Sequence, residues 1–125
     1  MSSEALHEDA ATLGPDVIDL HRAIVSLMEE LEAVDWYNQR AKATANPALR
    51  AILEHNRDEE KEHASMVPEW LRSSDAKFAE HLRTYLFIEA PVSEIEAVVE
   101  AGGEEPAAAE SDGSLAIGSL RQVKK

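Results

Sequence analysis

Two long stretches of this 125-residue chain place apolar residues at alternating steps of three and four, which is the spacing of helices that pack along one side. In the second stretch the series is apolar at both ends and polar in the middle: Leu49, Leu53, Asn56, Glu60, His63, Val67 and Trp70. A carboxylate in a helix-packing seam is costly to bury unless it is paired, hydrogen-bonded or bound to a metal. The polar middle of this seam therefore constrains the fold more than any other feature.

Glu60 and His63 are three residues apart, so both side chains project from one face of the expected helix and can converge on one point. A carboxylate oxygen together with an imidazole nitrogen suits iron, zinc or manganese. The spacing predicts a metal site in the middle of the seam.

The first stretch shows a similar irregularity. Its seam has the members Leu20, Ile24, Leu27, Leu31 and Val34. Glu30 lies beside this seam, and Tyr37 follows two turns later. One Glu on one helix and Glu-x-x-His on the next is half of the di-iron constellation of four-helix carboxylate bundles. We therefore expect an all-α fold, an antiparallel two-helix hairpin that is half a ferritin-like bundle, completed when two copies meet about a two-fold axis.

Local signals set the expected ends of these helices. Gly14-Pro15-Asp16 is a plausible start, and Asn46-Pro47 ends the first helix and opens the second, with Asn as N-cap and Pro at the first helical position. So short a connection makes the two helices antiparallel neighbours. The second helix is expected to run towards Arg72, with a kink or an early end at Pro68.

Beyond a break at residues 73–75, we expect a third helix over 75–89, stopped by Pro91, and a possible capping box from Ser93 to Glu96 that opens a short acidic helix. The expected organisation is a flexible N-terminus (1–13), a helical domain (14–99), an acidic flexible linker (100–112), a docking peptide (113–121) and a tail (122–125). The docking peptide is predicted from apolar residues on an otherwise polar and disordered tail, Leu115, Ile117 and Leu120.

Composition narrows the function. The chain has no cysteine, so any metal site uses oxygen and nitrogen ligands. A net charge of −13 argues against nucleic acid and anionic membranes as partners. Neither a signal peptide nor a transmembrane span is apparent, so a cytoplasmic protein is expected. A helical domain this small buries little core alone, which favours association.

Simpler interpretations stay open at this point. Glu60 and His63 could belong to a solvated helix face, and Tyr37 could be ordinary packing instead of an outer ligand or electron donor. Glu29 and Glu32, which add negative charge around Glu30, could guide cations inward or could only be solvated. The docking peptide could be plain disorder.

Four segments resemble the encapsulated ferritins. Residues 21–37 (HRAIVSLMEELEAVDWY) resemble the first helix of that family, 55–63 (HNRDEEKEH) the second, and 83–87 (RTYLF) the third. Residues 112–121 (DGSLAIGSLR) are similar to the peptide that targets such proteins to encapsulin shells.

The resemblance implies a ferroxidase that oxidises Fe(II) to Fe(III) with dioxygen at a di-iron site between two chains. By motif, Glu30, Glu60 and His63 of both chains would hold the iron, with Tyr37 close by. Glu29 and Glu32 would match an acidic entrance that takes calcium or another divalent ion. The family assembles as a decamer, a ring of five dimers, inside a cytoplasmic encapsulin nanocompartment that stores the mineral. The alternatives are a non-catalytic acidic adaptor, or a di-iron peroxidase or oxygenase.

Overall fold

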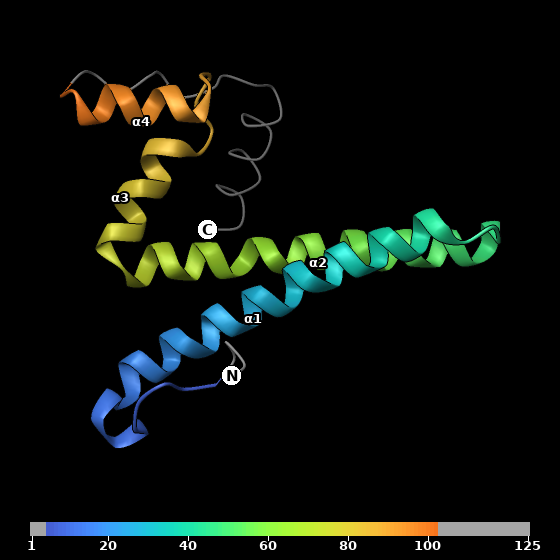
Figure 1. Cartoon of the computed structure of the whole chain (residues 1–125), viewed down its shortest axis with the longest axis horizontal. Helices are drawn as coiled ribbons and strands as arrows, with labels where there is room; N and C mark the ends of the chain where they lie inside the picture. Colours follow the sequence, from blue (N-terminus) through green and yellow to red (C-terminus); the bar gives the residue numbers. More distant parts are fainter. Residues whose placement is uncertain (1–4, 103–125) are drawn as a thin grey trace, which may run out of the picture. The chain divides into compact units, whose positions relative to one another are not determined.

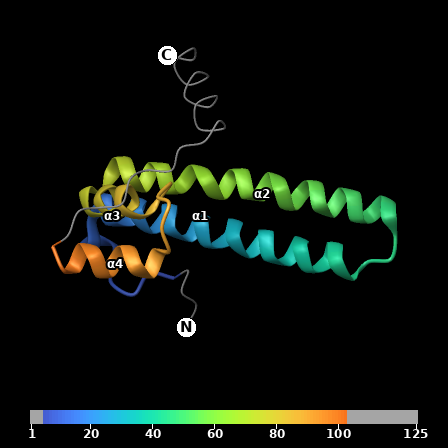
Figure 2. The same cartoon turned by 90° about the horizontal axis from the view of Figure 1, so that it is seen from above.

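The computed structural model describes residues 5–102, and every regular element in that range is a helix. The elements are α1 (Ala10–Ala43), α2 (Pro47–Ser74), α3 (Ala76–Tyr85) and α4 (Val92–Glu100) (Figure 1). The chain divides after Ala76 into two compact units. In the first unit α1 and α2 lie side by side and antiparallel (Figure 2), which confirms the predicted hairpin. No helix among residues 5–102 is long and apolar enough to cross a membrane.

The predicted start of the first long helix, at Gly14 and Pro15, coincides with a kink inside α1. Gly14 has φ 81° and ψ 167°, a left-handed φ that glycine adopts without a Cβ clash. Pro15 follows it and begins the uninterrupted part of α1. The structure adds one turn before this break, where the Asp9 carbonyl accepts from the Thr12 N–H at 2.9 Å and the Leu13 N–H at 3.1 Å.

The connection between α1 and α2 forms as predicted. The Asn46 side-chain oxygen accepts from the Leu49 N–H at 3.0 Å, and Pro47 occupies the first turn of α2, where its missing N–H costs nothing. Arg50 then reaches back across the turn. Its Nε donates to the Ala41 carbonyl at 3.0 Å and its Nη2 donates to the Thr44 carbonyl. These carbonyls lie at the C-terminal end of α1, which carries a partial negative charge. The Arg50 guanidinium supplies the hydrogen-bond donors that they lack and a positive charge that is attracted to this helix end.

The expected kink or early end at Pro68 is wrong, because α2 continues to Ser74 and contains no residue with non-helical dihedral angles. Pro68 cannot donate to the Ala64 carbonyl, so one hydrogen bond of the helix is lost. The next turn nevertheless holds Leu71, which is only 4% exposed. Burial of that side chain favours continuing the helix past the proline.

Two boundaries in the second unit also differ from the expectation. α3 ends at Tyr85 and not at 89, because Phe87 has φ 60°, which interrupts a right-handed helix. The capping box at Ser93 does not form. Pro91 is the N-cap of α4, and its carbonyl accepts from the N–H groups of Glu94 at 3.0 Å and Ile95 at 3.2 Å. The proline ring fixes φ, and an extended ψ at Pro91 lets α4 begin at Val92, one residue before Ser93.

Candidate metal centre

The less exposed residues of the hairpin include one series on each helix that follows steps of three and four, which we call the inner seam. On α1 its members are Leu20, Ala23, Leu27, Glu30, Val34, Tyr37 and Ala41, and on α2 they are Leu53, Arg57, Glu60, Ala64, Val67 and Leu71. All follow steps of three and four. The inner seam is where α1 and α2 pack against each other, and each half carries one glutamate near its middle.

This register corrects the predicted seams. Glu30 lies in the inner seam and not beside it, whereas Ile24 and Leu31 are 39% and 55% exposed. On α2 the predicted seam members Leu49 and Trp70 are 45% and 42% exposed, and His63 is exposed too. Alanines occupy the inner positions instead. Small side chains at these three alanine positions let the helices approach closely, which periodicity alone does not reveal.

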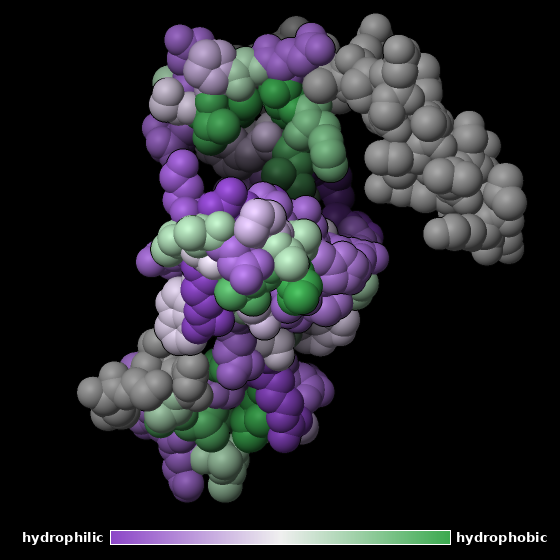
Figure 3. All heavy atoms as spheres, turned by 90° about the vertical axis from the view of Figure 1, so that its right-hand side faces the viewer, coloured by the Kyte–Doolittle hydropathy of each residue, from purple (hydrophilic) through white to green (hydrophobic). Residues whose placement is uncertain are grey.

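The larger apolar side chains form a second series on each helix, which we call the outer stripes. The α1 outer stripe contains Val17, Ile24, Met28 and Leu31, and the α2 outer stripe contains Leu49, Ile52, Met66 and Trp70, all between 36% and 58% exposed. His63 belongs to the α2 outer stripe by its spacing. Figure 3 shows apolar side chains at the surface among hydrophilic ones. Apolar stripes of this length on a small protein indicate interaction surfaces.

Glu30 is the most unusual side chain of the inner seam. Its Oε2 atom is buried and has no hydrogen-bond partner among the described residues. A carboxylate oxygen that has left water without gaining a donor lowers the stability of the fold. Such an oxygen fits a position that a cation occupies when the protein is complete.

Glu60 and His63 lie together on α2. The Glu60 Oε2 and the His63 Nδ1 are 3.7 Å apart, too far for a hydrogen bond. Two ligands that each lie about 2.1 Å from one ion are separated by roughly 3.0–3.4 Å, so a small side-chain rotation would let both bind the same metal. The Glu60 side chain is 26% exposed and the His63 side chain 46%, which leaves the pair open on one side.

Within the described residues, no three His, Cys, Asp or Glu side chains come close enough to hold a metal ion. The hairpin therefore brings Glu60 and His63 together but does not add Glu30 to them. As a set of three ligands, the predicted site is incomplete in one chain.

Helical geometry shows which way the three residues face. Each residue of a helix is rotated by about 100° from the residue before it. Most members of the α1 outer stripe come one residue after a member of the inner seam, whereas most members of the α2 outer stripe come one residue before one. The two stripes are therefore rotated from the inner seam in opposite senses along the chain. In antiparallel helices these rotations lead to opposite faces of the hairpin. Glu30, Glu60 and His63 all lean towards the face that carries the α2 outer stripe, so a second chain on this face would meet all three.

Tyr37 is half-buried in the inner seam, two turns beyond Glu30, whereas Glu29 and Glu32 are exposed. Sequence reasoning missed Arg40. Its guanidinium carbon lies 5.6 Å from the centre of the Tyr37 ring and 5.9 Å from that of Trp36. The spacing of three and four residues, which brings side chains together on a helix, could have revealed this contact.

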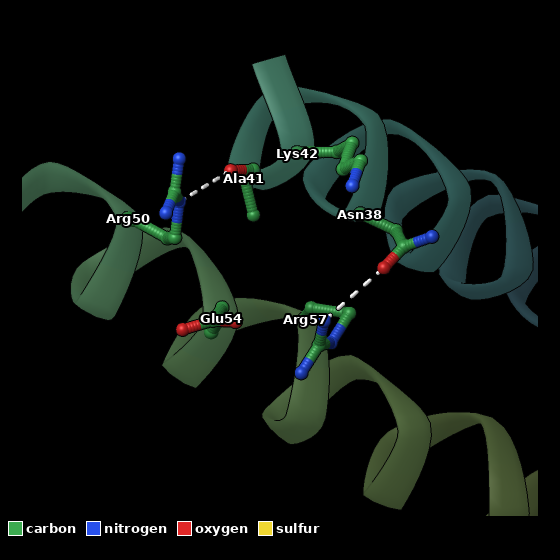
Figure 4. A pocket seen from close by; sticks show the side chains of 6 residues that line it. All are labelled: Asn38, Ala41, Lys42, Arg50, Glu54 and Arg57. Carbon is green, nitrogen blue, oxygen red and sulfur yellow. Dashed lines mark hydrogen bonds between the residues drawn. The ribbon is translucent and has the colours of Figure 1, made fainter. Parts of the chain in front are cut away.

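A cavity of about 300 Å³ lies between the two helices near their connection (Figure 4). It is lined by Asn38, Ala41, Lys42, Arg50, Glu54 and Arg57. Two of its cations already have partners: Arg50 donates to the carbonyls of Ala41 and Thr44, and Arg57 donates to the Asn38 side chain at 3.1 Å. We interpret this polar cluster as a clamp that holds α2 to the end of α1.

The docking peptide, with Leu115, Ile117 and Leu120, and most of the acidic linker lie outside the described residues.

A hairpin with Glu on one helix and Glu-x-x-His on the other corresponds to half of a ferritin-like carboxylate bundle. The sequence profile of the EncFtn-like family matches residues 5–89, and this chain belongs to that family. It is 58% identical over 126 residues to the encapsulated ferritin-like protein of Rhodospirillum rubrum, covering 96% of this chain and 90% of that protein.

Two further proteins extend the comparison. The encapsulin nanocompartment cargo protein EncC of Myxococcus xanthus is 34% identical over 114 residues, covering 83% of this chain and 86% of EncC. The crystal structure of protein ne0167 from Nitrosomonas europaea superposes with a TM-score of 0.68 at 52% identity, covering 70% of this chain and 97% of that one. Proteins similar to this chain therefore include an encapsulated ferritin-like protein and an encapsulin nanocompartment cargo protein.

Proposed function

We propose that the protein is a ferroxidase, which oxidises Fe(II) to Fe(III) with dioxygen at a di-iron site formed between two copies of the chain. The observation that carries the proposal is the orphaned Oε2 of Glu30, which is buried in the inner seam. The α2 half of that seam holds Glu60, and His63 lies next to Glu60 on the α2 outer stripe. A structural role would give that oxygen a donor within the chain. A metal-binding role leaves it vacant for a cation.

The ligands suit this chemistry. Glu30 and Glu60 of each chain supply hard oxygen ligands, which favour the ferric product, and His63 supplies a neutral imidazole nitrogen. Two chains that meet about a two-fold axis would offer four carboxylates and two imidazoles, which would hold two iron ions. Each of the two Fe(II) ions gives one electron to dioxygen, which takes up two protons and leaves as hydrogen peroxide.

The other predicted residues act around this centre. Tyr37 lies on the same inner seam as Glu30 and would stand close to the iron. Glu29 and Glu32 are exposed carboxylates near Glu30 and would form an acidic entrance, where calcium or another divalent ion also binds.

Assembly follows from the two outer stripes. Pairing through the α2 outer stripe would complete the site, because Glu30, Glu60 and His63 lean to that face. The α1 outer stripe on the opposite face would remain available for contacts between dimers, as in the expected ring of five dimers. Two self-associating faces on one chain are what a ring requires.

An open ring cannot enclose a mineral, so storage would fall to an encapsulin shell in the cytoplasm. The printed names of the Rhodospirillum and Myxococcus relatives describe encapsulated or encapsulin cargo proteins. The peptide at 113–121, with Leu115, Ile117 and Leu120, would bind the shell.

The test is oxygen uptake when Fe(II) is added to the purified, full-length protein as its natural oligomer. We expect uptake well above the autoxidation of iron in buffer, lost in Glu60→Ala. Glu62→Ala is the matched control, because it removes the same charge from an exposed position two residues further along α2. This variant should retain oxygen uptake.

Uptake no faster than the buffer blank would reject the ferroxidase. If the protein still loaded into encapsulin shells, a non-catalytic adaptor would become the favoured function. Rapid consumption of added hydrogen peroxide without Fe(II)-dependent oxygen uptake would instead favour a di-iron peroxidase.

A further inference from the structure

Arg40 lies against two neighbouring aromatic rings. Its guanidinium carbon is 5.6 Å from the Tyr37 ring centre and 5.9 Å from the Trp36 ring centre. Within the described residues, no hydrogen bond or ion pair is formed by the Arg40 side chain, so these rings are its contacts. Trp36 is 48% exposed and Tyr37 is half-buried.

A guanidinium within about 6 Å of a ring centre is attracted by the negative face of that ring. The same geometry opposes the loss of an electron from the ring, because the resulting radical cation and the guanidinium repel each other. The guanidinium does not lose its proton in proteins, so this repulsion persists at any physiological pH.

We propose that Arg40 is an electrostatic guard, which makes one-electron oxidation of Trp36 and Tyr37 less favourable. The inference rests on the proposed function for its oxidant. Iron oxidation releases hydrogen peroxide, and one further Fe(II) converts hydrogen peroxide into hydroxide and a hydroxyl radical, becoming Fe(III). Trp36 and Tyr37 follow Glu30 on the same helix, about two turns further along α1.

The damage that Arg40 would oppose is the oxidation of Trp36 to hydroxytryptophan. A first hydroxyl radical adds to the Trp36 indole and gives a neutral radical adduct. A second hydroxyl radical takes one electron from this adduct, giving hydroxide and a cation. The cation loses its ring proton to the hydroxide, which gives hydroxytryptophan and water. Arg40 acts on the loss of the electron, where positive charge appears on the ring.

The chain contains internal controls with which the oxidation of Trp36 and Tyr37 can be compared. It has two tryptophans and two tyrosines, and Arg40 covers one of each. Trp70 is 42% exposed, which is close to the exposure of Trp36, and Tyr85 is half-buried like Tyr37. Neither Trp70 nor Tyr85 has a cation over its ring within the described part of the chain. Oxidation ratios within one molecule therefore remove differences in dose.

The first experiment uses the metal-free, full-length protein and the azide radical, a neutral one-electron oxidant whose approach does not depend on protein charge. Peptide mass spectrometry then measures oxidation at each aromatic residue. From the Coulomb repulsion at these distances in water, Arg40→Gln should raise the Trp36:Trp70 ratio roughly threefold. Arg40→Lys, which keeps the charge, should stay near the unmodified protein.

Equal ratios in the unmodified protein and Arg40→Gln would overturn the proposal. So would a rise in Arg40→Lys as large as that in Arg40→Gln, because shape and not charge would then be responsible. Circular dichroism confirms that each variant keeps its helices before it is compared.

The second experiment adds Fe(II) and dioxygen. Excess oxidation of Trp36 and Tyr37 in Arg40→Gln during turnover supports the guard. Normal iron oxidation without that excess overturns it. Failure of the unmodified protein to oxidise iron, together with a positive azide result, rejects the proposed ferroxidase while the electrostatic effect of Arg40 stands.

Discussion

The inner seam of the hairpin holds two carboxylates, whereas the α2 outer stripe exposes large apolar side chains. Glu30 and Glu60 lie in the inner seam, where a small protein usually keeps apolar residues, whereas Ile52 and Met66 of the outer stripe are each 58% exposed. A domain that folded for itself alone would gain stability from the reverse arrangement. The difference indicates that the hairpin is half of a larger core, in which the outer stripe becomes interior and the carboxylates bind a cation.

The sharpest way to test this comparison is to remove the charge from the inner seam. Glu30→Gln should reduce iron oxidation at least a hundredfold, because a ligand of the proposed site is lost. The same change should raise the stability of the metal-free protein by about 1 kcal/mol, since an ionised oxygen without a donor is replaced by a neutral amide.

Oxygen uptake and the free energy of unfolding in urea measure the two effects. Glu62→Gln, at an exposed position on α2, is the control. A large loss of stability in metal-free Glu30→Gln would contradict the idea that this carboxylate is kept for a ligand.

The second prediction concerns the α2 outer stripe. Met66→Glu places a charge where another chain is expected, and should weaken self-association at least tenfold, because burying a large apolar side chain contributes roughly 1.5–3 kcal/mol. Iron oxidation should fall in parallel with the fraction of dimer. Sedimentation velocity measures the oligomer.

Leu31→Glu on the α1 outer stripe is the matched comparison. It should break up larger assemblies but leave an active dimer. If both variants were to give the same inactive monomer, the two faces would not have the separate roles assigned to them.

The third prediction concerns the clamp at the connection. Arg50→Ala removes donors from the carbonyls of Ala41 and Thr44 at the end of α1, and should lower the free energy of unfolding by about 1–2 kcal/mol. Lys42→Ala changes a cation that lines the same cavity and should have a smaller effect. Urea unfolding measures the free energy of unfolding of both variants. Equal losses of stability in the two variants would contradict the clamp.

The smallest effect is expected at Asp58. Hydrogen bonds from Arg57 and then from Lys61 hold the pKa of this carboxyl below its usual range. Its contribution to stability is therefore present above the pKa of the unfolded chain, about 4, and disappears as the pH falls through the lower folded pKa. Asp58→Asn should make the stability of the protein slightly less dependent on pH below about 4. An unchanged pH profile of thermal unfolding would show that solvent screens this exposed pair completely.

Much of the fold follows from local signals in the chain. Asn46 and Pro47 both occupy the positions predicted for them, because a side-chain acceptor and a missing N–H each suit only the start of a helix. The Glu60–His63 pair follows equally from spacing, since residues three apart share a helix face wherever the helix packs. The roles of Glu30, Glu60, His63 and Tyr37 in iron chemistry remain predictions.

Other features depend on packing. Ile24 and Leu31 fit the periodicity as well as Ala23 and Glu30 do, so the sequence determined that a seam exists but not which of two neighbouring registers faces inward. Close approach of two helices selects the small residues. Pro68 stays inside α2 although its local preference opposes this, and Phe87 ends α3 although no glycine or proline stands there.

The sequence by itself determined the helices, their antiparallel connection and the pairing of Glu60 with His63, because these depend on residues within a few positions of one another. Only the tertiary structure decided that the Glu30 Oε2 is buried without a partner among the described residues, and that Ile24 and Leu31 face outward. Those two facts depend on how closely α1 approaches α2, and the free energy of that approach is summed over the whole length of the hairpin.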